Sequence, residues 1–216
     1  MDYKLIEKLQ TLLPLGYLYL IILGILRDGV FFYMLGVNFL KYSSIMDILI
    51  SPIAELTSQP IILATVILMI IGFFFYYNFL AKNSHKKWVR ESVVSKKYLK
   101  QHPDSTELDL KIHIKKQVYF AVAFMILAFF LGGGVGTGIT VKEKITNNNL
   151  KIKHRITDDF GIQKEIYLID SNSAYFFYVE KGSKIVTIVP VSSIKKIELI
   201  NNKMFENGSF SSFLTL

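Results

Sequence analysis

The sequence predicts a membrane α-helical fold, with three transmembrane helices plus a re-entrant or interfacial helical segment, followed by a C-terminal small all-β domain. Three observations predict this fold class. Apolar residues make up 51% of the chain and its mean hydropathy is +0.38, more apolar than is typical of a soluble domain. Residues 60–81 are 22 residues without a charge, enough to cross a bilayer. From residue 141 the hydrophobic period changes to two, which is typical of strands.

The composition also limits the chemistry that the chain can perform. We expect a transmembrane domain over residues 1–140 and a soluble β domain over residues 141–216. The absence of cysteine excludes disulfide bonds, thiolate catalysis and cysteine-ligated metals. No group of His, Asp and Glu has the spacing of a metal site, and no nucleophile has a local partner. We therefore expect no enzyme, no metal and no cofactor.

The first span is expected at about residues 10–26, where an apolar run ends at Arg27. The next apolar run, residues 30–40, is only 11 residues long before Lys41, which is too short to cross a bilayer. We therefore predict that residues 30–59 are interfacial or re-entrant.

Two helix-start patterns occur inside this interfacial segment. Ser44 and Asp47 have the spacing of a capping box, and Ser51 followed by Pro52 is typical of an N-cap with proline in the first turn. These patterns predict two short helices, with a break near Ser51.

The other two spans are expected at residues 60–81 and 117–140, with a basic loop at residues 82–116 between them. That loop carries 10 Lys and Arg against 4 Asp and Glu, which places it in the cytoplasm by the positive-inside rule. With three spans, the N-terminus is then cytoplasmic and the β domain extracytoplasmic. A chain of this size, rich in Lys, Ile and Asn, suggests a bacterial inner membrane.

The C-terminal region has the pattern of about five short strands, separated by turn-forming residues. Such a set of strands predicts a small open barrel or curled sheet. The expected strands lie at residues 150–157, 165–169, 174–179, 185–189 and 194–200.

A polar stripe is the candidate ion path. As a helix, the interfacial segment places Ser44, Asp47, Ser51 and Glu55 three and four residues apart on one face. A carboxylate near membrane depth is costly unless it faces water, a cation or a partner. The alternative is that both acids cap helix starts at the membrane surface, where acidic groups offset the helix dipole.

Glycines at the end of the third span form two overlapping pairs, Gly132 with Gly136 and Gly134 with Gly138. Small residues four apart favour close helix packing. We expect tight helix packing together with a flexible exit into the β domain; the alternative is that the same run exposes backbone carbonyls to a pore. It is no phosphate loop, because the Lys-Ser/Thr of that motif is missing.

The basic loop is the candidate contact surface for membrane lipid headgroups. We do not expect nucleic-acid binding, because no recognised nucleic-acid motif accompanies the charge. The candidate headgroup contacts are Lys86, Lys87, Trp88, Arg90, Lys96 and Lys97.

These patterns lead to one functional hypothesis and two alternatives. We expect a homo-oligomeric ion channel, because symmetric repetition would bury the polar stripe that one three-span subunit leaves open. The first alternative is a membrane-anchored interaction or envelope-sensing protein, whose β domain binds a protein partner through exposed aromatics such as Tyr175 or Phe177. A pore-type toxin, defence effector or immunity protein is a further alternative.

Overall fold

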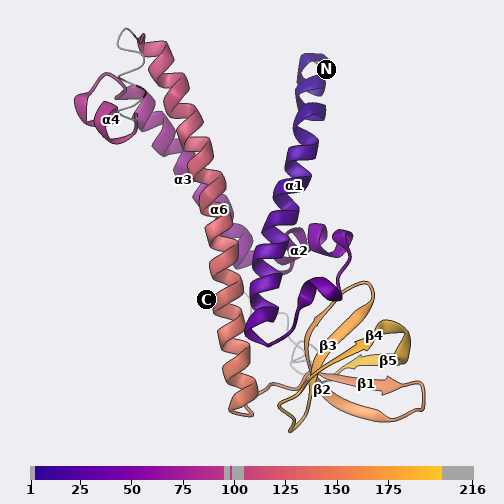
Figure 1. The fold of residues 1–216 in the computed structure, drawn as a ribbon. Helices are drawn as coiled ribbons and strands as arrows, with labels where there is room; N and C mark the ends of the chain where they lie inside the picture. Colours follow the sequence, from indigo (N-terminus) through magenta and orange to yellow (C-terminus); the bar gives the residue numbers. More distant parts are fainter. Residues whose placement is uncertain (1–2, 95–97, 99–104, 201–216) are drawn as a thin grey trace, which may run out of the picture. The chain divides into compact units, whose positions relative to one another are not determined.

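The computed structural model describes residues 3–94, 98 and 105–200 (Figure 1). They form two compact units, residues 1–50 with 134–216 and residues 51–133. The β sheet thus belongs to one unit with the first helix and the C-terminal part of the last. Among the described residues, three helices are long and apolar enough to cross a membrane: Gln10–Met34, Pro60–Lys82 and Glu107–Thr146.

Helix α1 (Tyr3–Met34) is continuous through Pro14 and through the charged pair at which the first span was expected to end. It therefore includes the first residues of the segment that was predicted to be interfacial. The helix ends at Met34, and Gly36 just beyond its end has a φ of +77°. The Gly36 N–H donates to the Tyr33 carbonyl at 3.0 Å and the Val37 N–H to the Phe32 carbonyl at 2.9 Å, which is the Schellman pattern.

A 3₁₀ turn, η1 (Phe39–Lys41), leads to helix α2 (Ile45–Ser58). The predicted break near Ser51 is wrong, because α2 is one helix with Pro52 inside it. Pro52 has no N–H, so the Ile48 carbonyl lacks the hydrogen bond that it would accept in a regular helix. This carbonyl lies against Gly24 of α1, where an added Cβ would collide with its oxygen and lie 3.1 Å from its carbon.

The second unit contains helices α3 (Pro60–Lys82) and α4 (Lys87–Ser92). Pro60 occupies the first helical turn, as expected, and Asn83 closes α3 by donating its side-chain amide to the Phe79 carbonyl at 2.8 Å. A core of aliphatic side chains holds this unit together. Its buried members are Leu80, Val89, Val94, Leu110, Ile114 and Val118.

Helix α6 (Glu107–Thr146) is 40 residues long, and the expected span 117–140 lies within it. A capping box starts it: Thr106 donates to the Asp109 carboxylate from its N–H at 3.0 Å and from its hydroxyl at 2.7 Å. The idea that the glycine run ends the helix is wrong, since α6 continues past Gly138. It ends before Asn148, which has a φ of +53°.

The β domain is a five-stranded antiparallel sheet with the strand order β4-β3-β2-β1-β5. Strands β1 to β4 form a meander, and β5 returns to pair with β1 after the short turn η2 (Val191–Ser193). No pairing joins β4 to β5 among the described residues, so the sheet is open. The strands are His154–Asp158 (β1), Gln163–Ser171 (β2), Tyr175–Glu180 (β3), Val186–Pro190 (β4) and Ile194–Leu199 (β5).

The two faces of the sheet bury different cores, because successive side chains of a strand point to opposite faces. Phe177 on β3 packs with residues of α1 and η1, including Phe32 and Phe39. Its neighbour Tyr178 packs on the other face with Ile156 and Ile166. The sheet is therefore joined to the helices through one face and keeps a small core of its own on the other.

Candidate functional site at the junction of α1, α2 and the β sheet

An aromatic cluster joins the C-terminal end of α1 to strand β3. Phe32 stacks on Phe39 with ring centroids 4.7 Å apart and an interplanar angle of 9°. Phe177 lies 4.7 Å from Phe32, and Tyr42 meets Tyr175 edge-to-face at 5.4 Å. Such pairs add about 0.5–1.5 kcal/mol each beyond the apolar area that they bury. The cluster fixes the sheet against the helix end.

Asp47, the first acid of the polar stripe, accepts hydrogen bonds from the turn between β2 and β3, a contact that we call the Asp47 clasp. Its carboxylate accepts the Ser44 N–H at 2.9 Å and the Ser44 hydroxyl at 2.7 Å, completing the predicted capping box of α2. It also accepts the Ser173 N–H at 3.1 Å and the Ser173 hydroxyl at 3.0 Å. The same carboxylate thus caps α2 and holds the sheet.

Asn172 makes the second half of this clasp. Its side-chain amide donates to the Tyr42 carbonyl at 2.9 Å, while its oxygen accepts the N–H groups of Ala174 at 3.0 Å and Tyr175 at 2.8 Å. The side chain therefore shapes its own turn and ties it to the segment before α2. The sequence signal for this contact is only the turn-forming pattern of residues 170–173, which predicts a turn but no distant partner.

The hydrogen bonds also set the charge state of Asp47. Burial raises the pKa of its carboxyl group, but the bonds from Ser44 and Ser173 outweigh burial and lower the pKa below the ordinary value of 3.8. Hydrogen bonds donated to a carboxylate stabilise its charged form. Asp47 is therefore an anion at neutral pH, with both oxygens engaged.

The other residues of the expected stripe lie along the same helix. Ser51 and Glu55 are half-buried, one turn apart on α2. Glu55 accepts a hydrogen bond from the Gln59 side chain at 2.7 Å. Ser51 and Glu55 thus follow Asp47 along α2, with Ser44 just before the first residue of the helix, but the carboxylate of Asp47 also binds the β2–β3 turn.

A buried ion pair inside α1 was not expected from the sequence. Arg27 pairs with Asp28, and Asp28 is only 1% exposed. Charges in a membrane-spanning segment are costly and are often functional. The sequence signal was present, since two charges interrupt an apolar run, but at that stage the run was taken to end there. In the structure the pair lies well within the helix.

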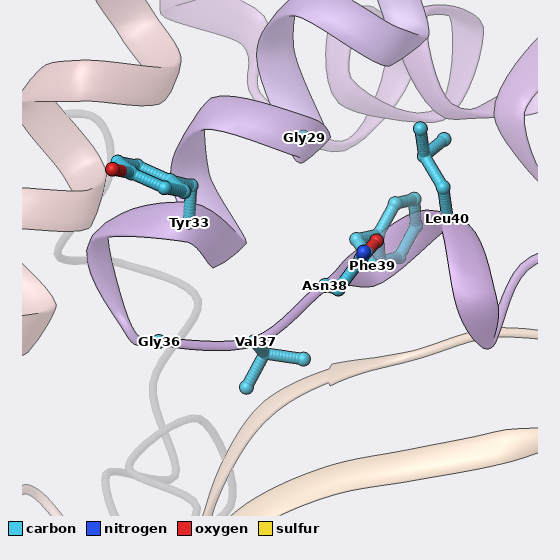
Figure 2. Close-up of a pocket in the computed structure, with 7 residues that line it drawn as sticks. All are labelled: Gly29, Tyr33, Gly36, Val37, Asn38, Phe39 and Leu40. Atoms are coloured by element: carbon cyan, nitrogen blue, oxygen red, sulfur yellow. The ribbon is translucent and has the colours of Figure 1, made fainter.

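A shallow groove of about 440 Å³ lies beside the end of α1 (Figure 2). Gly29 and Gly36 leave space along it, and Figure 2 shows Tyr33 and Leu40 at opposite ends of the lining. Tyr33 is 76% exposed and Leu40 is also exposed. The groove has no charged residue in its lining, so it offers apolar contact but no specific chemistry.

The glycine run divides into two kinds of position. An added Cβ at Gly134 would collide with the Arg27 carbonyl oxygen, and one at Gly138 would lie 3.0 Å from the Met34 Cβ. Gly132 and Gly136 have nothing within 4 Å of an added Cβ. The second small-residue pair, Gly134 with Gly138, therefore lets α6 approach α1 closely, whereas the first pair has no such neighbour.

The expected headgroup contacts belong to α4 and the residues that flank it. Lys86 is the N-cap of α4, and Lys87 and Trp88 are exposed. Trp88 lies 5.9 Å from Phe79, centroid to centroid, and Arg90 is half-buried. Lys96 and Lys97 lie outside the described residues.

Comparison with protein-family models, curated protein sequences and solved structures found no match to this chain. The function is therefore argued from the site alone. Within the part of the chain that the structure describes, no three His, Cys, Asp or Glu side chains come together as a metal site would require. What the junction does offer is a packed and hydrogen-bonded connection between the end of α1, the start of α2 and the β sheet.

Proposed function

We propose that this chain is an integral membrane protein that anchors and orients an interaction domain, the β sheet, which binds a protein partner. The Asp47 clasp carries the proposal. Four donors from two serines converge on its carboxylate, so the acid that best fitted an ion path is engaged in fixing the sheet to the helices. A pathway for ions needs carboxylate oxygens that are free to exchange ligands.

The sheet presents apolar surface that suits a partner. Phe160, at the β1–β2 turn, is 90% exposed, and Ile162 beside it is also exposed. Loops that a β sheet holds in place often carry binding residues. The aromatics first expected in this role are not available: Phe177 is fully buried and Tyr175 is half-buried.

For orientation we propose the arrangement that the charges predict, in a bacterial inner membrane with the β domain outside the cytoplasm. The native chain has no cysteine, so a single introduced cysteine reports its own position. We expect Phe160→Cys to react with a membrane-impermeant maleimide on intact spheroplasts. Reaction only after the membrane is opened would reverse the proposed orientation.

Site-specific photo-cross-linking in cells tests the partner. A benzophenone amino acid replaces Phe160 in the full chain, and the matched control carries it at Lys195, an exposed residue of β5. We expect a discrete adduct with one other protein from position 160 and none from position 195. Equal adducts at both positions, or none at position 160, would refute the proposal.

An ion-conducting homo-oligomer is the second candidate function. The buried Asp28 in an apolar helix favours it, because buried carboxylates of membrane helices often lie on ion pathways. Ion flux into liposomes is compared for the native chain and an Asp47→Asn, Glu55→Gln double variant, with Glu143→Gln as a control for lost charge. This candidate is favoured if the double variant reduces ion flux and the Glu143→Gln control does not. It is also favoured if the photo-cross-linking at position 160 yields an adduct of this chain with a second copy of itself.

A further inference from the structure

A second hollow, of about 300 Å³, lies on the face of the sheet that carries Ile156 and Tyr178, at one end of the core on that face. It lies between the β1–β2 turn and residues of β4 and β5. Ile156, Val189 and Ile194 form apolar walls, and the same three side chains belong to the core on that face. The hollow therefore continues the apolar interior of the sheet outward.

The alternation of the strands places polar groups at the mouth of this hollow. Asp158 shares a face with Ile156 on β1, as Lys164 does with Ile166 on β2. Asp159, in the turn, also lines the mouth and is exposed. An apolar chamber with a charged rim suits a ligand that has an apolar stem and a charged head.

The Tyr178 hydroxyl is the unusual group of this hollow. The tyrosine is only 3% exposed as a whole residue and lines the hollow. Among the described residues, its hydroxyl has no hydrogen-bond partner and is not a fully buried atom, so it is accessible from the hollow. Burial raises the pKa of this hydroxyl, so it stays neutral and can both donate and accept.

The charge around the hydroxyl is net negative. Lys164 pairs with Glu180 at 2.7 Å, and this hydrogen bond raises the pKa of the lysine, so the two charges offset each other. Asp158 and Asp159 then remain at the rim. One Asp158 oxygen accepts the N–H groups of Phe160 at 3.0 Å and Ile162 at 2.9 Å, which fixes that carboxylate in place. The rim therefore favours a cation.

We propose that this hollow binds a basic side chain of the partner protein. The aliphatic stem packs on Ile156, Val189 and Ile194, and the cationic head donates to the Tyr178 hydroxyl and faces Asp159. The exposed Phe160 beside the mouth extends the contact to the segment that carries the basic residue. This inference rests on the proposed function, since the partner supplies the side chain.

Side-chain analogues test the hollow without the partner. The probes are n-butylammonium and n-propylguanidinium, the side chains of Lys and Arg, added to the purified full chain in zwitterionic lipid nanodiscs. Binding is followed by calorimetry, with n-butanol and butyrate as uncharged and anionic controls. We expect a cationic probe to bind at least several-fold more tightly than either control. Butanol or butyrate binding as tightly would overturn the proposal.

Ethanolammonium distinguishes a basic protein side chain from a lipid headgroup as the occupant of the hollow. It carries the amine of a phospholipid headgroup without an aliphatic stem, so we expect it to bind more weakly than n-butylammonium, because it cannot cover the apolar walls. Equal affinity for the two amines would point to a headgroup and overturn the choice of a protein side chain.

Two variants locate the site. Tyr178→Phe should weaken n-butylammonium binding about tenfold, as for a lost hydrogen bond to a charged group. Asp159→Asn should weaken it by about threefold, as for an exposed ion pair. Glu143→Gln, an exposed acid of α6, should change nothing. Unchanged affinity in both pocket variants would refute the site, while the cross-linking at position 160 would still decide the proposed function.

Discussion

Gly134→Ala is expected to destabilise the packing of α6 on α1. The added Cβ would collide with the Arg27 carbonyl oxygen and lie 3.1 Å from its carbon and 3.2 Å from its Cα, against 3.4–4 Å for an ordinary contact. Backbone atoms cannot rotate away as a flexible side chain can. The two helices would have to separate by roughly 0.5–1 Å, a gap that forfeits a quarter to a half of the attraction between facing atoms.

The matched control is Gly136→Ala, two residues along the same helix. Nothing lies within 4 Å of an added Cβ there, so alanine should stabilise α6 by about 0.5–1 kcal/mol through its better helix propensity. Overpacking at Gly134 typically costs about 1–3 kcal/mol. Both variants gain this helix propensity, so their free energies of unfolding should differ by the overpacking cost alone, about 1–3 kcal/mol.

Unfolding in a titration with a denaturing detergent, followed by circular dichroism, measures this difference. Both variants keep the composition of the apolar span, so their interaction with detergent is matched. If Gly134→Ala is as stable as Gly136→Ala, the close approach of α6 to Arg27 is refuted.

Three further changes test the sheet and the second unit by the same unfolding measurement. Asp47→Ala should lower the free energy of unfolding by about 2 kcal/mol at neutral pH. Because folding lowers the pKa of Asp47, this stabilisation is complete well above pH 3.8 and is lost as the pH falls through the pKa of the folded state. A difference in stability between the native chain and the variant that stays the same under acid would contradict these hydrogen bonds. Phe177→Ala should cost about 3–5 kcal/mol, and a smaller loss would mean a looser aromatic cluster. Ser84→Ala should leave the free energy of unfolding unchanged or raise it by up to about 1 kcal/mol, because the buried Ser84 hydroxyl has no hydrogen-bond partner among the described residues. A clear loss of stability in this variant would show that the hydroxyl does have a partner.

The three long apolar helices and the C-terminal β sheet were predictable because their signals are local. An uncharged run of 22 residues gave α3 almost to the residue, and alternation with turn-forming residues gave five strands. The start of α6 lies outside the predicted span because the residues of its first turns are charged, so the apolar run begins later than the helix. Thr106 and Asp109, which have capping-box spacing, mark the true start.

The errors in the helices arise from contacts between distant residues. Pro52 and the glycines of α6 are helix breakers by propensity, yet both helices continue. Gly24 makes room for the Ile48 carbonyl, and Gly134 makes room for Arg27. Tertiary packing of this kind overrides propensity, and a single sequence does not show which distant residue will supply it.

The candidate site shows the same limit. Asp47 was singled out, and the Ser44 cap was predicted, but its second partner lies 126 residues away at Ser173. Spacing along a helix identifies which polar side chains share a stripe, not which of them meet another domain. The buried Asp28 was missed because its charge was used to end a span.

The carboxylate of Asp47 serves two contacts at once, the N-terminal cap of α2 and the hydrogen bonds to the β2–β3 turn. The first turn of a helix has N–H groups without helical partners, so it is the part that frays when its cap is lost. A load that pulls Ser173 away from α2 draws on the same carboxylate that caps this turn. Because one carboxylate serves both contacts, a substitution of Asp47 removes the α2 cap and the hydrogen bonds to the β2–β3 turn together.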